Sequence, residues 1–152
     1  MIRVLFVCLG NVCRSPMAEM IFKDIVRSNG KEKDFYIDSA GTSDENVWNH
    51  SGIYPNTKAV LKKNNIAFTE HYARQMTRED YDNFDYIVCM EDYNRRCIIQ
   101  IVGDDKDNKV HRLLDFTTSP QDIDDPWYHR DFDRTFREIS YGCRSLFEKI
   151  MG

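Results

Sequence analysis

The fold is decided by residues 2–16, which read IRVLFVCLGNVCRSP. Residues 2–7 form a short, almost continuous apolar run of β-forming residues, which is typical of a strand buried on both faces. The loop of residues 8–14 follows, and Ser15 and Pro16 then have the character of a helix N-cap and first helical position. A strand, a loop and a helix in this order predict the start of a parallel sheet.

The sequence beyond this stretch continues the same alternation. Apolar residues recur at helical spacing after Pro16, Gly30 gives that helix an end, and residues 35–40 predict a second strand. A strand, helix and strand of this kind pair in parallel through a right-handed crossover. We further expect helices over residues 55–65, 93–102 and 132–150, strands over 86–90 and 110–114, and a capping box formed by Thr77 and Asp80.

The alternation of strands and helices predicts a single α/β domain spanning residues 1–152. No internal repeat, low-complexity segment or interdomain linker interrupts it. Ligands of such folds bind outside the carboxyl ends of the strands. The loop of residues 8–14 follows a strand directly, so we expect the functional site there.

Composition and charge exclude several classes of function. The formal net charge is −4, with no broad basic face, which argues against a nucleic-acid partner. No apolar run approaches the roughly 20 residues of a membrane span, and the N-terminus does not resemble a signal peptide, so we expect a cytoplasmic protein without membrane insertion. The five cysteines include no Cys-x-x-Cys pair, so we predict neither a disulfide framework nor a metal site.

The loop that begins at Cys8 carries the chemistry. Backbone N–H groups of a tight loop running into a helix form a cradle for anions, and the helix dipole reinforces it. Gly10 permits the curl that such a loop needs, and the planar guanidinium of Arg14 matches two phosphate oxygens. The same positive field would stabilise the thiolate of Cys8, the form of cysteine that attacks.

An isolated cysteine at the end of a strand is more often a small buried apolar residue than a nucleophile. The joint pattern of strand, Cys8, a loop with Gly10, then Arg14 and a helix reverses that expectation. The loop is not a Walker A motif, because Gly-Lys-Ser/Thr is missing, and no Gly-x-Gly-x-x-Gly occurs. A phosphate or related oxyanion is therefore the expected ligand, rather than a nucleotide.

Residues 8–16 closely resemble the signature loop of the low-molecular-weight protein tyrosine phosphatases. Further segments resemble that family in the family's order: 38–42, 71–75, 84–90 and Asp125-Pro126. The resemblance implies a flavodoxin-like sheet of four parallel strands flanked by helices on both faces. It implies hydrolysis of phosphotyrosine in protein substrates through a cysteinyl-phosphate intermediate, without a metal or cofactor.

An aryl phosphate needs a general acid to protonate its leaving oxygen. Asp125 directly precedes Pro126, as in the acid loop of the family, so we assign it this role in preference to its neighbour Asp124. Trp127 and Tyr128 follow, and we expect them to form a wall against the substrate's aromatic ring. We expect Trp48 to supply another part of the rim.

The resemblance also implies roles for the residues around the nucleophile. Substrate phosphate would be bound by the loop residues Leu9, Gly10, Asn11, Val12 and Cys13, and Ser15 would donate to the Cys8 thiolate. Asn11, Ser39 and His71 would hold the loop in shape. Cys13 is either a small buried residue of the loop or the partner of Cys8 in a reversible disulfide that protects the nucleophile from irreversible oxidation. Glu91 departs from the family, which usually has aspartate there.

Three other functions stay open. A thioredoxin-coupled arsenate reductase shares the loop but needs shuttling cysteines, for which Cys89 and Cys97 are a candidate pair. A protein-arginine phosphatase of the same family has threonine at the position of Val12. A non-catalytic phosphate-binding or redox-sensing module would not need the acid, Asp125. For the phosphatase we expect a monomer or a weak dimer.

Overall fold

The protein is built around a sheet of four parallel strands. The computed structural model describes all 152 residues. In the sheet the strands follow the order β2-β1-β3-β4, so the chain starts in a central strand, as the doubly wound flavodoxin-like fold requires. The strands are β1 (Ile2–Cys8), β2 (Phe35–Gly41), β3 (Tyr86–Cys89) and β4 (Val110–Arg112).

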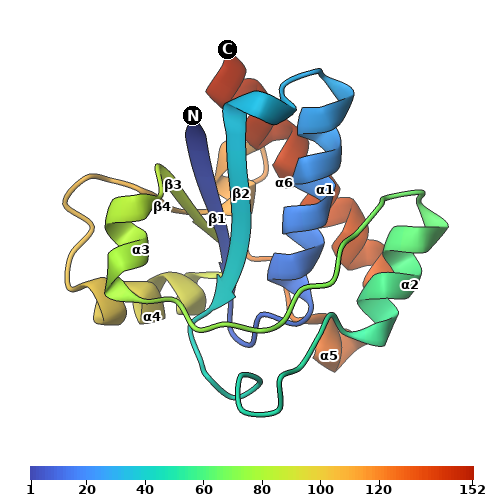
Figure 1. The fold of residues 1–152 in the computed structure, drawn as a ribbon, viewed down its shortest axis with the longest axis horizontal. Helices are drawn as coiled ribbons and strands as arrows, with labels where there is room; N and C mark the ends of the chain where they lie inside the picture. The colour runs from blue at the N-terminus through green and yellow to red at the C-terminus, as the bar shows by residue number, and fades with distance from the viewer.

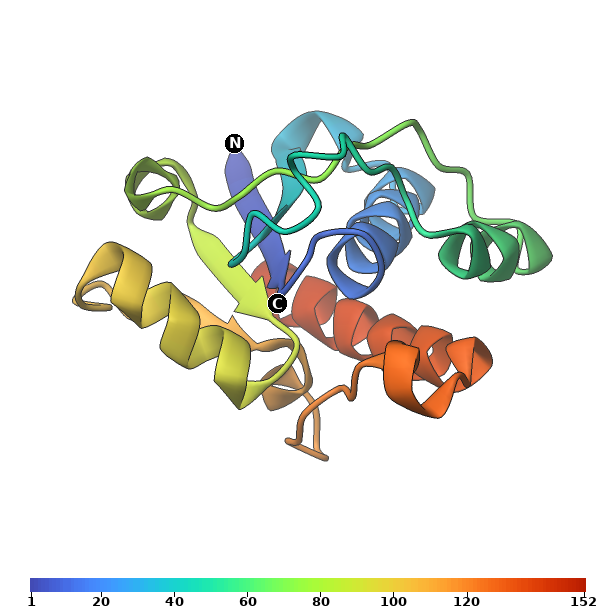
Figure 2. The same ribbon diagram turned by 90° about the horizontal axis from the view of Figure 1, so that it is seen from below.

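Helices cover both faces of this sheet, as predicted (Figure 1). One face packs against α1 and α6, with α2 lying outside α1, and the other face packs against α3 and α4, which the view from below also shows (Figure 2). No helix is long and apolar enough to span a membrane. The helices are α1 (Arg14–Ser28), α2 (Pro55–Lys63), α3 (Arg78–Asn83), α4 (Asp92–Val102), α5 (Pro126–His129) and α6 (Phe132–Met151), and short 3-10 turns cover Glu32–Asp34 and Leu113–Phe116.

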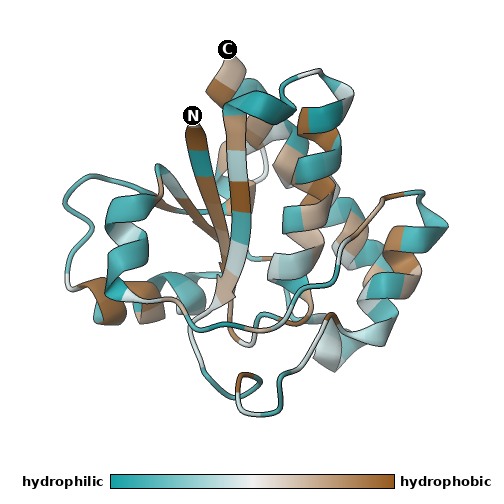
Figure 3. Cartoon of the chain, in the orientation of Figure 1, coloured by the Kyte–Doolittle hydropathy of each residue, from teal (hydrophilic) through white to brown (hydrophobic).

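Strand β1 explains why the core has two halves. Successive side chains of a strand point to opposite faces, so Val4 and Phe6 enter the core beneath α1 and α6, while Leu5 and Val7 enter the core beneath α4. All four are fully buried, and each contributes about 1.5–3 kcal/mol by leaving water. The strands are accordingly mostly hydrophobic and the outer helix faces hydrophilic (Figure 3).

The parallel register brings the carboxyl ends of the strands together at one edge. Cys8 at the end of β1 lies opposite Gly41 at the end of β2, and Val7 lies opposite Cys89 at the end of β3. The loop after β1, the segment of residues 42–54 and α5 gather at this edge, while both chain termini lie at the opposite end (Figure 1). The functional loop therefore projects from the middle of the sheet.

The structure corrects three details of the expected elements. Helix α1 begins at Arg14 after Cys13, so Ser15 is not its N-cap; the Ser15 hydroxyl lies instead 3.0 Å from the Cys8 sulfur. Strand β4 ends at Arg112, because the next residues turn into a 3-10 helix. The short helix α5, which starts at Pro126, was not expected. The capping box is confirmed by the Thr77 N–H, which donates to Asp80 at 2.8 Å.

Candidate active site

A cavity of about 420 Å³ opens at the carboxyl edge of the sheet. Its floor is the loop after β1, and its walls come from two segments far apart in the chain, residues 45–54 and 125–132. The lining residues are Cys8, Leu9, Gly10, Asn11, Val12, Cys13, Arg14, Glu45, Asn46, Tyr54, Asp125, Trp127, Tyr128 and Phe132. The loop, Asp125, Trp127 and Tyr128 thus meet in one cavity, as the sequence predicted.

The phosphate loop, residues 8–14, turns its carbonyl groups outward. The carbonyls of Cys8, Leu9 and Val12 accept hydrogen bonds of 2.8–3.0 Å from the backbone N–H groups of flanking segments. The C=O and N–H of a trans peptide point in opposite directions. The N–H groups of Leu9, Gly10 and Cys13 therefore point into the curl of the loop, where they form a site for an anion.

The sulfur of Cys8 lies at the centre of this curl. The Cys8 residue is 3% exposed, and its Sγ accepts a hydrogen bond from the N–H of Asn11 at 3.3 Å. The Ser15 hydroxyl lies 3.0 Å from the sulfur. The side-chain amide of Asn11 donates to the Ser15 oxygen at 2.9 Å, so the hydroxyl proton of Ser15 is left for one of two acceptors, the Cys8 sulfur or the carbonyl oxygen of Ala40 at 3.4 Å.

Asn11, rather than Gly10, supplies the unusual backbone conformation of the loop. Its φ is 57°, in the left-handed region, where asparagine is tolerated better than most residues. Gly10 lets a side chain approach, since a Cβ there would lie 2.5 Å from Nδ2 at the end of the Asn46 side chain, which would have to shift. Gly41 is needed more strictly, because a Cβ there would lie 2.7 Å from the backbone carbonyl oxygen of Leu9. Two glycines therefore let the walls approach the loop.

A buried polar network holds Asn11 in place. Its Nδ2 donates to Ser39 at 3.0 Å, and its Oδ1 lies 2.9 Å from Nε2 of His71. Ser39 in turn donates to Glu19 at 2.6 Å. Ser39 and His71 thus lie where the sequence predicted, and Glu19 was missed because a helix glutamate has no distinguishing sequence signal. Glu19 and His71 also lie near Asp38 with metal-ligand spacing, but these groups already bind other side chains.

Arg14 is the buried cation of the cavity. It is 2% exposed, and its Nη1 donates to the carbonyl oxygen of Ile123 at 2.8 Å. Its Nη2 lies 3.3 Å from Glu91 Oε1 and 3.7 Å from Asp125 Oδ2. Burial lowers the pKa of the guanidinium, but the Cys8 thiolate and the two carboxylates outweigh that effect and raise it. The charge is therefore fixed, and Glu91, the departure from the family pattern, orients it.

Two carboxylic acids line this cavity, Glu45 and Asp125, and Asp125 is the one that lies beside Arg14. Its side chain is 27% exposed, and its Oδ1 accepts the N–H of Trp127 at 2.9 Å, which caps α5. Asp124 points away and pairs with Arg134 at 3.0 Å, with 60% of its side chain exposed. The geometry thus separates the two neighbouring acids, and of these two only Asp125 lines the same cavity as Cys8.

Aromatic rings form one wall of the cavity. Trp127 and Tyr128 belong to it, as predicted, and Tyr54 and Phe132 complete it. The Tyr54 ring stacks on Phe132 with centroids 5.9 Å apart and meets the edge of Trp127 at 5.8 Å. Trp48 does not line the cavity: it is 83% exposed, and its indole N–H donates to a neighbouring carboxylate. Tyr54 supplies the ring that the sequence assigned to Trp48.

The remaining thiols differ from Cys8 in their surroundings. Burial raises the pKa of Cys13 to about 12, although Thr57 donates a hydrogen bond to its sulfur at 3.1 Å. Cys89 and Cys143 are fully buried in the core, as predicted, and burial raises the pKa of each. All five cysteines are free.

Several lining residues had no clear signal in the sequence. Tyr54, Phe132, Glu45 and Asn46 reach the cavity only through the tertiary arrangement. Phe132 reads in the sequence as the first core position of the last helix.

Comparisons with known proteins agree with this geometry. The model of a family described as low molecular weight phosphotyrosine protein phosphatase matches residues 3–151. The low molecular weight protein-tyrosine-phosphatase YfkJ of Bacillus subtilis is 38% identical over 154 residues, covering 99% of this chain and 96% of the relative. The low molecular weight phosphotyrosine protein phosphatase of Sus scrofa is also 38% identical, covering 97% and 94%. A crystal structure of YfkJ has a TM-score of 0.92 at 37% identity, covering 99% and 95%.

Proposed function

Because this chain belongs to the low molecular weight phosphotyrosine protein phosphatase family, we propose that it hydrolyses phosphotyrosine in proteins through a cysteinyl-phosphate intermediate. One observation carries the proposal: Cys8, Arg14 and Asp125 line one cavity whose wall is aromatic. A nucleophile, a cation and an acid are what transfer of a phosphoryl group from a phenol requires.

In the first step the Cys8 thiolate attacks phosphorus. The inward N–H groups of the phosphate loop and the guanidinium of Arg14 stabilise the charge on the three non-bridging oxygens. The phosphorus–oxygen bond to tyrosine breaks, and protonated Asp125 transfers its proton to the leaving phenolate. Tyrosine leaves as the neutral phenol, and phosphate remains bonded to the sulfur.

In the second step water regenerates the enzyme. Asp125, now a carboxylate, accepts a proton from a water molecule that attacks the phosphorus. The sulfur–phosphorus bond breaks, inorganic phosphate is released, and Cys8 returns to the thiolate. The hydrogen bonds from Ser15 and from the N–H of Asn11 stabilise this leaving sulfur. Arg14 and the loop amides supply the electrostatic stabilisation in both steps, so the mechanism uses no metal.

The wall of the cavity supports an aryl ester as the substrate. Tyr54 and Trp127 present rings against which a phosphorylated ring packs. Phosphoserine would place its phosphate in the loop without filling the space beside these rings. Phosphotyrosine proteins are therefore the proposed substrates, in preference to phosphoarginine proteins or arsenate.

The same cavity supports a redox control of activity. Peroxide would oxidise the Cys8 thiolate to a sulfenic acid, and the Cys13 thiol would displace water from it to form a disulfide. This role suits a protein of the cytoplasm, where thiols are kept reduced. Mass spectrometry after mild peroxide treatment tests it, and a failure to detect a disulfide between these two residues would refute it.

The test of the proposed function is hydrolysis of 4-nitrophenyl phosphate and a phosphotyrosine peptide by the reduced protein in EDTA. We expect turnover of both substrates that Cys8→Ser abolishes, and we expect Asp125→Ala to lower kcat/KM on the phosphotyrosine peptide, whose phenolate leaves poorly, by about 10²–10⁴-fold. The matched control is Asp124→Ala, because that carboxylate neighbours the acid in sequence but pairs with Arg134 outside the cavity. We expect the control to keep kcat/KM within about threefold.

Two results would contradict the proposal. No turnover by the reduced, folded protein would exclude a phosphatase, and reduction of arsenate coupled to thioredoxin would then be assayed. Equal losses in Asp124→Ala and Asp125→Ala would exclude Asp125 as the specific acid.

A further inference from the structure

Arg130 has an unusual backbone conformation directly after the acid segment. It ends α5 with φ 61°, in the left-handed region, and its N–H donates to the carbonyl of Pro126 at 2.8 Å. The left-handed region is energetically unfavourable for residues with a side chain, so they stay in it only when other contacts hold them there. The contacts that hold Arg130 are therefore expected to matter.

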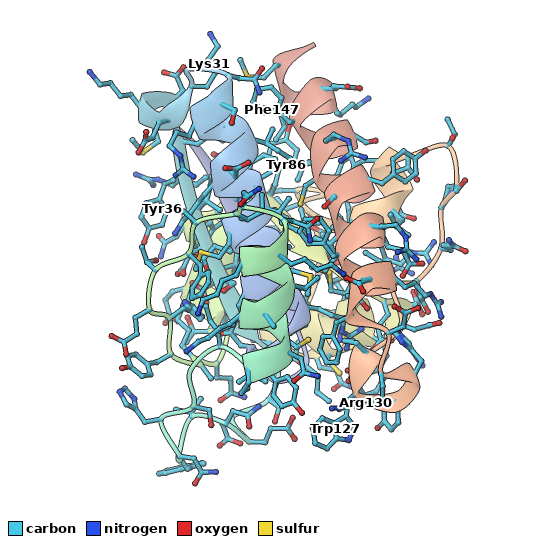
Figure 4. All side chains as sticks on the ribbon, turned by 90° about the vertical axis from the view of Figure 1, so that its right-hand side faces the viewer. Lys31, Tyr36, Tyr86, Trp127, Arg130 and Phe147 are labelled. Carbon is cyan, nitrogen blue, oxygen red and sulfur yellow. The ribbon has the colours of Figure 1, made fainter.

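The guanidinium of Arg130 lies against the aromatic wall of the cavity. Its carbon is 5.9 Å from the ring centroid of Tyr54, 5.3 Å from that of Trp127 and 5.5 Å from that of Phe132. Its Nη2 also donates to the Tyr54 hydroxyl at 3.3 Å. It makes no salt bridge with a carboxylate, and this exposed cation is held instead by attraction to the ring faces. Arg130 and Trp127 lie side by side at the site end of the molecule (Figure 4).

The three rings come from the two sides of the active site. The N–H of Tyr54 donates to the carbonyl of Val12 at 2.8 Å, so this ring is tied to the phosphate loop. Trp127 lies in α5, and its N–H donates to the carboxylate of Asp125. Arg130 bridges these two rings and thereby joins the loop that holds the nucleophile to the segment that holds the acid.

We propose that Arg130 is a positioning residue that fixes Asp125 relative to Cys8 by clamping the rings of Tyr54 and Trp127. The inference rests on the proposed function. The Arg130 side chain makes no hydrogen bond or salt bridge with the phosphate loop or with Asp125, so it acts through the aromatic wall. Its loss would let α5 shift against the phosphate loop.

Such a shift has a specific kinetic signature. Protonation of the leaving oxygen needs the Asp125 carboxyl within hydrogen-bond reach, and a displacement of about 1 Å costs up to about 10²-fold. A good leaving group, such as 4-nitrophenolate, departs with little help from an acid, whereas phenolate needs it. Capture of phosphate by the loop and Arg14 does not depend on the acid. Arg130 should therefore matter for poor leaving groups and not for phosphate affinity.

The experiment compares Arg130→Gly, Arg130→Gln and Arg130→Lys with the wild-type enzyme. Each is assayed for kcat/KM on phenyl phosphate and 4-nitrophenyl phosphate, for inhibition by inorganic phosphate and for thermal unfolding. Glycine removes the backbone strain together with the clamp, so this variant should fold at least as well as the others. Lysine keeps the charge but lacks the planar fork. The control is Arg96→Gln, which removes another exposed arginine that lies over a ring, that of Tyr93.

We expect all three Arg130 variants to lose about tenfold or more on phenyl phosphate and less than about threefold on 4-nitrophenyl phosphate. The phosphate inhibition constant should stay within about twofold, and the control should resemble the wild type. Equal losses on both substrates, weaker phosphate binding, or full recovery by lysine would overturn the proposal, as would unchanged rates in the glycine variant. A wild-type enzyme without turnover would instead contradict the proposed function, so the two failures are distinguishable.

Discussion

Replacing Asn11 by alanine should destabilise the protein and disable the phosphate loop together. Asn11 is 1% exposed, and its side-chain amide makes hydrogen bonds of 2.9–3.0 Å with four partners. These are the hydroxyls of Ser15 and Ser39, the ring of His71 and the N–H of Arg74. A lost hydrogen bond costs about 1 kcal/mol, and a buried partner left unpaired costs about 1–3 kcal/mol.

The left-handed backbone adds to this loss. At φ 57° alanine is less favourable than asparagine by about 1 kcal/mol, whereas glycine carries no such penalty. We therefore expect Asn11→Ala to lower the free energy of unfolding by about 4 kcal/mol, and Asn11→Gly by about 3 kcal/mol. Both variants should lose about 10²-fold or more in kcat/KM, because the loop amides no longer converge on the phosphate.

Urea titrations followed by circular dichroism measure both free energies, and hydrolysis of an aryl phosphate measures the rates. A loss below about 1 kcal/mol in Asn11→Ala would refute the view that this network holds the loop. Equal stabilities of the alanine and glycine variants would refute the contribution of the left-handed backbone. Full activity in either variant would show that the phosphate loop keeps its shape without the hydrogen bonds of the Asn11 side chain.

Three further outcomes are expected. Gly41→Ala should cost about 1–3 kcal/mol and at least about tenfold in kcat/KM, because its Cβ would lie 2.7 Å from the phosphate-loop backbone; Gly52→Ala, with 3.7 Å to the nearest atom, should be tolerated in the same melting and rate assays. Burial raises the pKa of Cys89 to about 12 and also raises that of Cys143, so above about pH 9 the unfolded state loses thiol protons first and the unfolding free energy falls by up to about 1.4 kcal/mol per pH unit per thiol. Urea titrations between about pH 8 and 10.5 should show a shallower fall in Cys143→Ala, and an unchanged slope would contradict this account. Trp48→Ala should keep kcat/KM within about twofold, since the indole is 83% exposed outside the cavity; a large loss would restore Trp48 to the substrate site.

Local patterns predicted the parts of the fold that depend on local physics. The apolar run of residues 2–7 gave the central strand, because a strand buried on both faces has no polar positions. The loop after it was predicted as an anion site from its residue types, and the structure agrees in the direction of its carbonyl groups. Helix α6 was predicted almost to its ends, since its apolar residues recur at helical spacing over twenty residues.

The aromatic wall could not be predicted in the same way. Trp48 and Tyr54 lie in one irregular segment without periodicity, so nothing local decides which ring turns into the cavity. Tyr54 turns into the cavity because its backbone N–H donates a hydrogen bond to the carbonyl of Val12 and its ring stacks on Phe132. Both contacts are with distant parts of the chain. The proximity of a residue to a motif in sequence is therefore weak information about a wall built from separate segments.

Both sides of the active site depend on a residue with an unfavourable backbone conformation. On each side a residue other than glycine is held in the left-handed region: Asn11 in the phosphate loop and Arg130 behind the acid. Each is held by partners far away in sequence, which are Ser39 for Asn11 and Tyr54 for Arg130. Neither conformation is favourable locally, so both persist only while the surrounding packing is complete. Cys8 and Asp125 therefore reach their positions as a consequence of the tertiary fold, which explains why sequence motifs point to these residues but do not give their geometry.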